Sequence, residues 1–154
     1  YLWEIWCEKE FGSKIKSIFL DKKDLLDTVE YSLIRVKSNN LANEIFQRIH
    51  ENESSFGEMA AEFSLGPEKI TGGKIGPIPL SAPDREISEL LRINDVGKLL
   101  SPIKIGEWFV ILRLDKFISA KLDQKMFKKL LLIEGDNFIK SSVQKVIENS
   151  RKIK

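Results

Sequence analysis

The stretch GKLLSPIKIGEWFVILRL, residues 97–114, contains the clearest strand signal in this sequence and the turn that leads into it. Its last seven residues, 108–114, are apolar except for Arg113. Because side chains alternate between the two faces of a strand, a strand that is apolar on both faces is expected at the centre of its sheet. Gly97 and Pro102 predict a turn, followed by a short extended segment, immediately before it.

The region upstream predicts a second strand and two helices. Apolar and β-branched residues alternate over residues 29–36, which is typical of a strand. Ser38 then opens a helix with one apolar face. Ser54 or Ser55 opens the next helix, with Glu58 in its first turn.

The segment between these helices and the strand at 108–114 is irregular. Residues 64–83 are rich in glycine and proline, so we expect a structured loop with a short strand near Ile75. Gly72-Gly73 lies outside any phosphate-binding motif, and we expect positive φ angles there. Asp84 is expected to cap a helix of one or two turns.

Both ends of the sequence predict helices. Residues 2–20 carry apolar side chains at helical spacing, with a kink expected at Gly12, and Asp21 is expected to cap a short helix after them. A long helix is predicted from Asp123 to Arg151, in which Gly135 costs about 1 kcal/mol. Because this helix is longer than the small sheet beside it, we expect its distal half to pack against the first helix.

Composition excludes several functional classes. The 25 basic and 23 acidic residues are interspersed, so no strong field for nucleic acid is predicted. No apolar run reaches the roughly 18 to 20 residues of a membrane span. The single Cys7 allows neither an intramolecular disulfide nor a zinc site, and we expect a buried hydrophobic residue there. The sequence begins at Tyr1 inside a predicted helix, so we expect it to be a fragment of a longer protein.

Five segments occur in the order found in one known family. They resemble the first strand, second helix, Gly-Gly loop, turn and last strand of parvulin-type (PpiC, rotamase) peptidyl-prolyl isomerases. The resemblance implies an α+β, FKBP-like fold with a small, mostly antiparallel sheet, surrounding helices, and N- and C-terminal helices that pack together. It divides the chain into a helical flank at 1–28, a parvulin domain at 29–117 and a second helical flank at 118–154. The five segments are LIRVK (33–37), FGEMAAEFS (56–64), GGKIG (72–76), GKLLSPI (97–103) and WFVILRLD (108–115).

The resemblance implies a chemistry without cofactor or metal. Amide resonance sets a barrier of roughly 18 to 20 kcal/mol for rotating an X–Pro bond. A catalyst holds the proline in an apolar pocket and binds the twisted bond more tightly than the planar one. The family's pocket leucine falls on Ile75, its pocket methionine on Leu80, and its pocket phenylalanine on Ile87 or Leu90.

The family's polar catalytic positions are replaced in this chain. Its first histidine falls on Leu33, its aspartate or cysteine on Gly66, and its second histidine on Phe109, or on Val110 with a different gap. The one histidine, His50, is expected to face solvent at the end of a helix. We therefore predict no confident catalytic residue. The predicted substrate-binding residues are Tyr31, Leu33, Ile75, Leu80, Ile87, Leu90 and Phe109.

A polar side chain from elsewhere in the chain could restore a hydrogen bond in the groove. Tyr31 is the preferred candidate because it shares a strand face with Leu33. The full set of candidates is Tyr31, Ser32, Ser101, Lys104 and Glu107.

Two functions follow from these observations, with a third that sequence does not separate from the second. The first is an isomerase of low activity that acts on X–Pro bonds in unfolded or extended polypeptide. The second is a non-catalytic polypeptide-binding chaperone, and the third a docking module of a secretion or peptide-maturation apparatus. The helical flanks resemble those of bacterial secretion-associated foldases, and residues 11–14, 27–32 and 66–68 are similar to a cyanobacterial branch of them.

Overall fold

A computed structural model describes residues 1–153, which form two compact units. One unit is Asp24–Ala120. The other combines the two ends of the chain, Tyr1–Lys23 and the segment from Lys121 onward. Among the described residues, no helix is long and apolar enough to cross a membrane.

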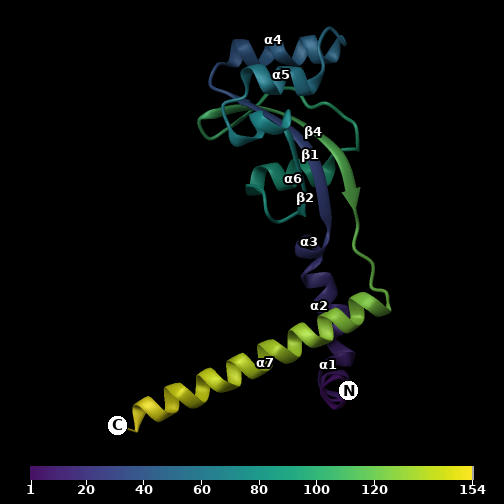
Figure 1. The fold of residues 1–154 in the computed structure, drawn as a ribbon, viewed down its shortest axis with the longest axis vertical. Helices are drawn as coiled ribbons and strands as arrows, with labels where there is room; N and C mark the ends of the chain where they lie inside the picture. The colour runs from purple at the N-terminus through teal and green to yellow at the C-terminus, as the bar shows by residue number, and fades with distance from the viewer. Residues whose placement is uncertain (154) are drawn as a thin grey trace. The chain divides into compact units, whose positions relative to one another are not determined.

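The unit Asp24–Ala120 contains a four-stranded sheet in the order β2-β1-β4-β3, with every neighbouring pair antiparallel. The two central strands, β1 and β4, run side by side (Figure 1). The prediction that residues 108–114 form a central strand is therefore confirmed. The strands are β1 Thr28–Val36, β2 Lys74–Pro79, β3 Ile103–Ile105 and β4 Trp108–Ile118.

Helix caps in this unit follow the local sequence. The Ser38 side chain accepts a hydrogen bond from the Leu41 amide at the start of α4, and Ser55 forms a capping box with Glu58 at the start of α5. Asp84 begins α6 without a side-chain cap bond, and this helix is longer than predicted. The loop prediction missed a 3₁₀ helix, η2. The helices are α3 Lys23–Leu26, α4 Asn39–His50, α5 Phe56–Phe63, η2 Pro67–Thr71 and α6 Arg85–Ile93.

The sheet separates two hydrophobic cores because side chains alternate between its faces. We call them the α6 core and the α4–α5 core, after the helices that cover each face. The α6 core contains Val29, Tyr31, Leu33, Leu80, Ile87, Leu91, Val110, Leu112 and Leu114. The α4–α5 core contains Ile34, Val36, Ala42, Ile45, Phe56, Met59, Ala60 and Ile111.

The second unit is helical, and α1 packs against α7 within it (Figure 1). The prediction that Asp21 caps the next helix is wrong, because Asp21 is the last residue of α2. Cys7 is fully buried, as expected. The helices are α1 Leu2–Phe11, the 3₁₀ helix η1 Gly12–Lys14, α2 Ile15–Asp21 and α7 Gln124–Lys152.

Gly135 has a packing role in this unit. A Cβ atom at this position would lie 2.5 Å from Cys7 Sγ and 2.7 Å from Trp3 Cζ2, so glycine lets α1 approach α7 closely. The expectation that the distal half of α7 packs against the first helix is wrong in part. Phe138 contacts Trp6 and Phe11, but the apolar residues beyond it are exposed, because α1 does not cover them. These are Ile139, Val143, Val146, Ile147 and Ile153.

Candidate functional site

A cavity of about 330 Å³ opens on the α6 face of the sheet. Its volume is at the lower end of the range for small-ligand pockets, roughly 300 to 1,000 Å³. Its walls combine apolar and charged side chains. The apolar lining is Leu33, Ile87, Ile105, Trp108 and Val110, and the charged lining is Arg35, Asp84 and Glu107.

Three elements bring these residues together. The alternation of β1 places Tyr31, Leu33 and Arg35 on the same face of the sheet. Helix α6 contributes Ile87 from its first turns. Gly106, with φ of +59°, makes the tight turn between β3 and β4 that brings Trp108 to the cavity.

The structure places two of the predicted pocket residues, Leu33 and Ile87, in the cavity wall. Tyr31 and Leu80 are buried in the α6 core, with exposed fractions of 4% and 1%, and Tyr31 borders a second cavity described below. Leu90 packs against this core while remaining partly exposed. These residues therefore form one continuous apolar region.

Ile75 also packs against the α6 core, but it borders a different cavity. That second cavity has a volume of about 400 Å³ and lies along the β1–β2 pair. It contains charged residues from β4, Arg113 and Asp115, which bond to each other at 2.7 Å. Ile75 is thus not part of the wall of the cavity that Leu33 lines.

Phe109 lies on the wrong face of the sheet for the predicted role. It packs against the α4–α5 core, whereas its neighbour Val110 lies in the α6 core and lines the cavity. One residue along a strand reverses the face. Of the two residues proposed for the family's second histidine, Val110 is therefore the one that lines the cavity.

Tyr31 does not line the cavity, although its side chain lies on the cavity side of the sheet. Burial raises the pKa of its hydroxyl to about 12, with smaller opposing effects from the nearby charges of Arg35 and Asp84. The hydroxyl is therefore protonated at neutral pH.

The other polar candidates have different positions. Glu107 lines the cavity. Ser32 points away from it and donates to Asp115 Oδ2 at 2.5 Å. Ser101 and Lys104 are exposed and are not part of the cavity lining.

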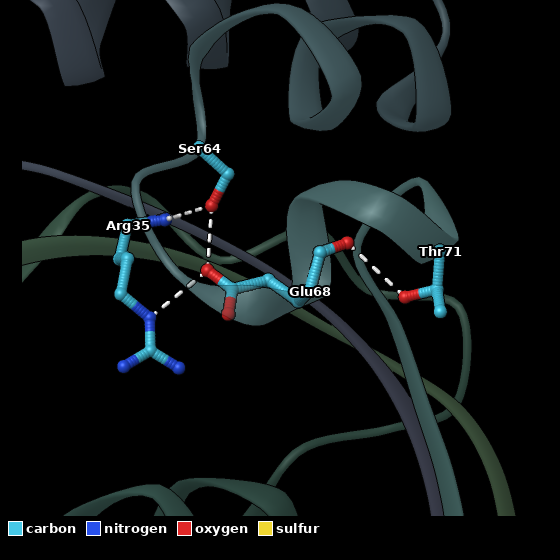
Figure 2. A network of polar contacts seen from close by, with 4 residues as sticks. All are labelled: Arg35, Ser64, Glu68 and Thr71. Atoms are coloured by element: carbon cyan, nitrogen blue, oxygen red, sulfur yellow. Dashed lines mark hydrogen bonds and ion pairs between the residues drawn. The ribbon is translucent and has the colours of Figure 1, made fainter.

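The structure adds a polar network that sequence reasoning missed (Figure 2). Arg35 Nε donates to Glu68 Oε1 at 2.9 Å, and the Ser64 hydroxyl donates to the same oxygen at 2.6 Å. The Arg35 amide donates to Ser64 Oγ at 3.2 Å. The Glu68 side chain is 1% exposed and that of Arg35 31% exposed, so the pair extends from the core to the cavity.

One signal in the sequence pointed to half of this network. Arg35 follows Tyr31 and Leu33 at two-residue spacing, so strand alternation places its charge on the groove face. No local pattern indicated Glu68, which lies 33 residues further along the chain.

Comparisons with known proteins agree with this geometry. The sequence matches the Rotamase family, the PPIC-type PPIASE domain, over residues 25–116. A search of curated proteins found no significant match.

Solved structures share the fold at low sequence identity. Peptidylprolyl isomerase PrsA from Bacillus anthracis is 19% identical, with a TM-score of 0.59 over 94% of this chain and 69% of that one. A SurA-like chaperone from Campylobacter jejuni is 20% identical, with a TM-score of 0.55 over 94% of this chain and 66% of that one. The parvulin domain of PpiD from E. coli is 24% identical, with a TM-score of 0.52 over 64% of this chain and 95% of that one.

The family match covers more than half of the chain and coincides with the unit that holds the sheet and the cavity. The predicted α+β fold with an antiparallel sheet, surrounding helices and packed terminal helices is confirmed. The chain belongs to the PpiC-type peptidyl-prolyl isomerase, or parvulin, family.

Proposed function

We propose that this chain catalyses cis–trans isomerisation of X–Pro bonds in unfolded or extended polypeptide, with low turnover. The observation that carries the proposal is the cavity on the α6 face of the sheet, lined by apolar and charged side chains, within a parvulin domain. An apolar wall suits a proline ring, and the charged groups Arg35, Asp84 and Glu107 are available to the polar backbone on either side of it.

The reaction does not require the missing histidines for bond chemistry. Isomerisation breaks no covalent bond, so a site accelerates it by desolvating the imide and binding the twisted state preferentially. Leu33 and Val110 line the cavity with apolar side chains, and the resemblance places the first family histidine at Leu33 and the second at Phe109 or Val110. An apolar wall still desolvates the imide, but it lacks the polar contacts that the family's histidines supply. We therefore expect low turnover.

Extended polypeptide is the substrate class that the comparisons favour. PrsA from Bacillus anthracis is a peptidylprolyl isomerase, and the Campylobacter protein is a SurA-like chaperone. In this chain, the helical unit adds exposed apolar side chains on α7, including Val143 and Val146, that suit contact with unfolded chains. The proposed partner is therefore a non-native protein segment containing proline.

A protease-coupled isomerisation assay on peptides with varied residues before proline tests the proposal. We expect the wild type to accelerate cis–trans exchange and Trp108→Ala to lose most of this acceleration, since Trp108 forms part of the cavity wall. Trp6→Ala is the matched control, because it removes an indole from the other unit. An inactive wild type, or equal losses in both variants, would contradict the proposal.

The replacement of all three family polar positions favours a second candidate, a non-catalytic polypeptide-binding module. The same preparation distinguishes the two. The binding module would be established by two results together. The wild type would not accelerate isomerisation, and it would bind a proline-containing unfolded chain with an affinity that Trp108→Ala weakens.

A further inference from the structure

The position of Arg35 sets it apart from the other arginines of this unit. It is the next groove-facing residue after Leu33 on β1, and it lines the cavity together with Ile87 and Trp108. Its Nε donates to Glu68, and Figure 2 draws no hydrogen bond from either terminal nitrogen to the residues shown. Within residues 1–153, these terminal nitrogens have no hydrogen-bond partner, so their N–H groups are available to a ligand.

Glu68 holds this guanidinium from a buried, well-fixed position. Its Oε1 accepts from both Arg35 and Ser64, and its backbone carbonyl accepts from the Gly73 amide at 2.8 Å. Its other carboxylate oxygen, Oε2, is buried and has no hydrogen-bond partner among the described residues. A buried carboxylate is costly unless a cation is paired with it. Separating Arg35 from Glu68 is therefore unfavourable, and the pair holds the guanidinium in place.

Arg35 and Glu68 pack closely against Gly66. A Cβ atom at Gly66 would lie 2.5 Å from Arg35 Nε and would also overlap the Glu68 carboxylate. The backbone at Gly66 has φ of −96°, which any residue adopts, so the ion pair and not the backbone demands glycine there. The Arg35–Glu68 pair therefore fills the space beside Gly66.

We propose that Arg35 is a catalytic residue of this isomerase, donating a hydrogen bond from its terminal guanidinium nitrogens to the imide of the bound X–Pro bond, and that Glu68 is its positioning residue. The inference rests on the proposed function. In the planar bond the nitrogen lone pair is delocalised into the carbonyl, so the nitrogen is a poor acceptor. When the bond twists, the lone pair returns to nitrogen and accepts a hydrogen bond. A donor aimed at this position stabilises the twisted state selectively. The step transfers no proton and breaks no bond.

Exchange NMR on a short prolyl peptide, with the full chain and no coupling protease, tests the proposal. We expect Arg35→Gln to lower kcat/KM by about tenfold or more, since preorganised donors contribute at least that much in other enzymes. The matched control is Arg48→Gln, which removes an exposed arginine paired with Glu44 on α4 and should leave the rate unchanged. Glu68→Gln should cause an intermediate loss, mainly in kcat.

A pH profile separates donation from a structural role. The wild-type rate should be flat between pH 6 and 8, because guanidinium remains protonated. Arg35→His should regain activity as pH falls below about 6.5, where imidazole becomes a cation. Arg35→Gln leaves the buried Glu68 carboxylate without its cation and can therefore unfold the protein. In that case the double variant Arg35→Gln/Glu68→Gln removes both charges. It should fold but still have a low isomerisation rate.

The outcomes identify which idea fails. If the wild type is active and folded Arg35→Gln, or the double variant, keeps the wild-type rate, the role proposed for Arg35 is wrong. The proposed isomerase function is then unaffected. A wild type that binds the peptide without accelerating exchange overturns both. Slow folded variants with the rising acid limb in Arg35→His support the proposal.

Discussion

Arg35, Gly66 and Glu68 are the residues that most affect the charge and packing beside the cavity. An ion pair whose carboxylate is buried is costly to separate, because the remaining charge has no compensating partner. The pair also excludes any larger residue from position 66. The three residues therefore act as one unit, although they come from β1 and from the region of η2.

Gly66→Ala should lower the free energy of unfolding by about 1 to 3 kcal/mol, the usual cost of overpacking. The new methyl group would overlap Arg35 Nε and Glu68. Urea denaturation measures the effect. Gly57→Ala is the control, since its Cβ would make an ordinary contact at 3.8 Å.

The same substitution tests the coupling directly. In a Glu68→Ala background, Gly66→Ala should cost clearly less, because the obstructing carboxylate is gone. Equal costs in the two backgrounds would show that the pair does not define the space around Gly66.

Tyr31 predicts a pH dependence of stability on the alkaline side. Burial raises the pKa of this hydroxyl to about 12, above the ordinary value of about 10. The folded protein therefore holds the proton more tightly, and this contribution is complete below about pH 10 and lost as pH rises through about 12. Between pH 9 and 11, the wild type should lose about 1 kcal/mol more than Tyr31→Phe in urea denaturation. Parallel curves for the two proteins would contradict a buried hydroxyl.

Among the helices and strands, short-range signals govern where each begins. The capping box of α5 is an example: the Glu58 amide donates to Ser55 Oγ at 3.2 Å, and the Ser55 amide donates to the Glu58 carboxylate at 2.9 Å. Hydrogen bonds to the carboxylate, first from the Ser55 amide and then from the Ser55 side chain, lower the pKa of the Glu58 carboxyl, which is consistent with the charged form being the acceptor.

Ser55→Ala should reduce stability by about 1 kcal/mol, because one orphan amide of α5 loses its acceptor. Thermal or urea unfolding of the whole chain measures it. Ser54→Ala, one residue outside the cap, is expected to be neutral, and a similar loss there would mean that the cap had been assigned to the wrong serine.

For the molecule as a whole, the two units have separate cores, and Gly135 permits the helical one to close. In an exposed helix, Gly135→Ala would be stabilising by about 1 kcal/mol. Here the added Cβ would overlap Cys7 and Trp3, so we expect a net loss.

The readouts for Gly135→Ala are chosen to separate the units. Near-ultraviolet circular dichroism of the stacked Trp3 and Trp6 should change, while isomerisation at the cavity should not. Gly12→Ala is the control, because its Cβ would contact Glu8 at an ordinary 3.6 Å. A parallel loss of isomerase activity would show that the two units are energetically coupled.

Much of this architecture was predictable from local pattern. Alternation predicted β1 and the central position of β4, and serine or aspartate caps predicted the starts of α4, α5 and α7. Such features depend on side chains within a few residues of one another, whose geometry follows from the helical or strand period. The order of the motifs was enough to recognise the parvulin family.

Which side chains line the cavity could be determined only from the folded structure. Phe109 and Val110 are both apolar, so their composition does not say which of them faces the cavity, and register in the sheet settles it. The partnership of Arg35 with Glu68 joins residues 33 apart, and the η2 turn that carries Glu68 has no periodic signature. Long-range packing brings such side chains together, because their contact depends on how loops close over the sheet and not on the period of any single element.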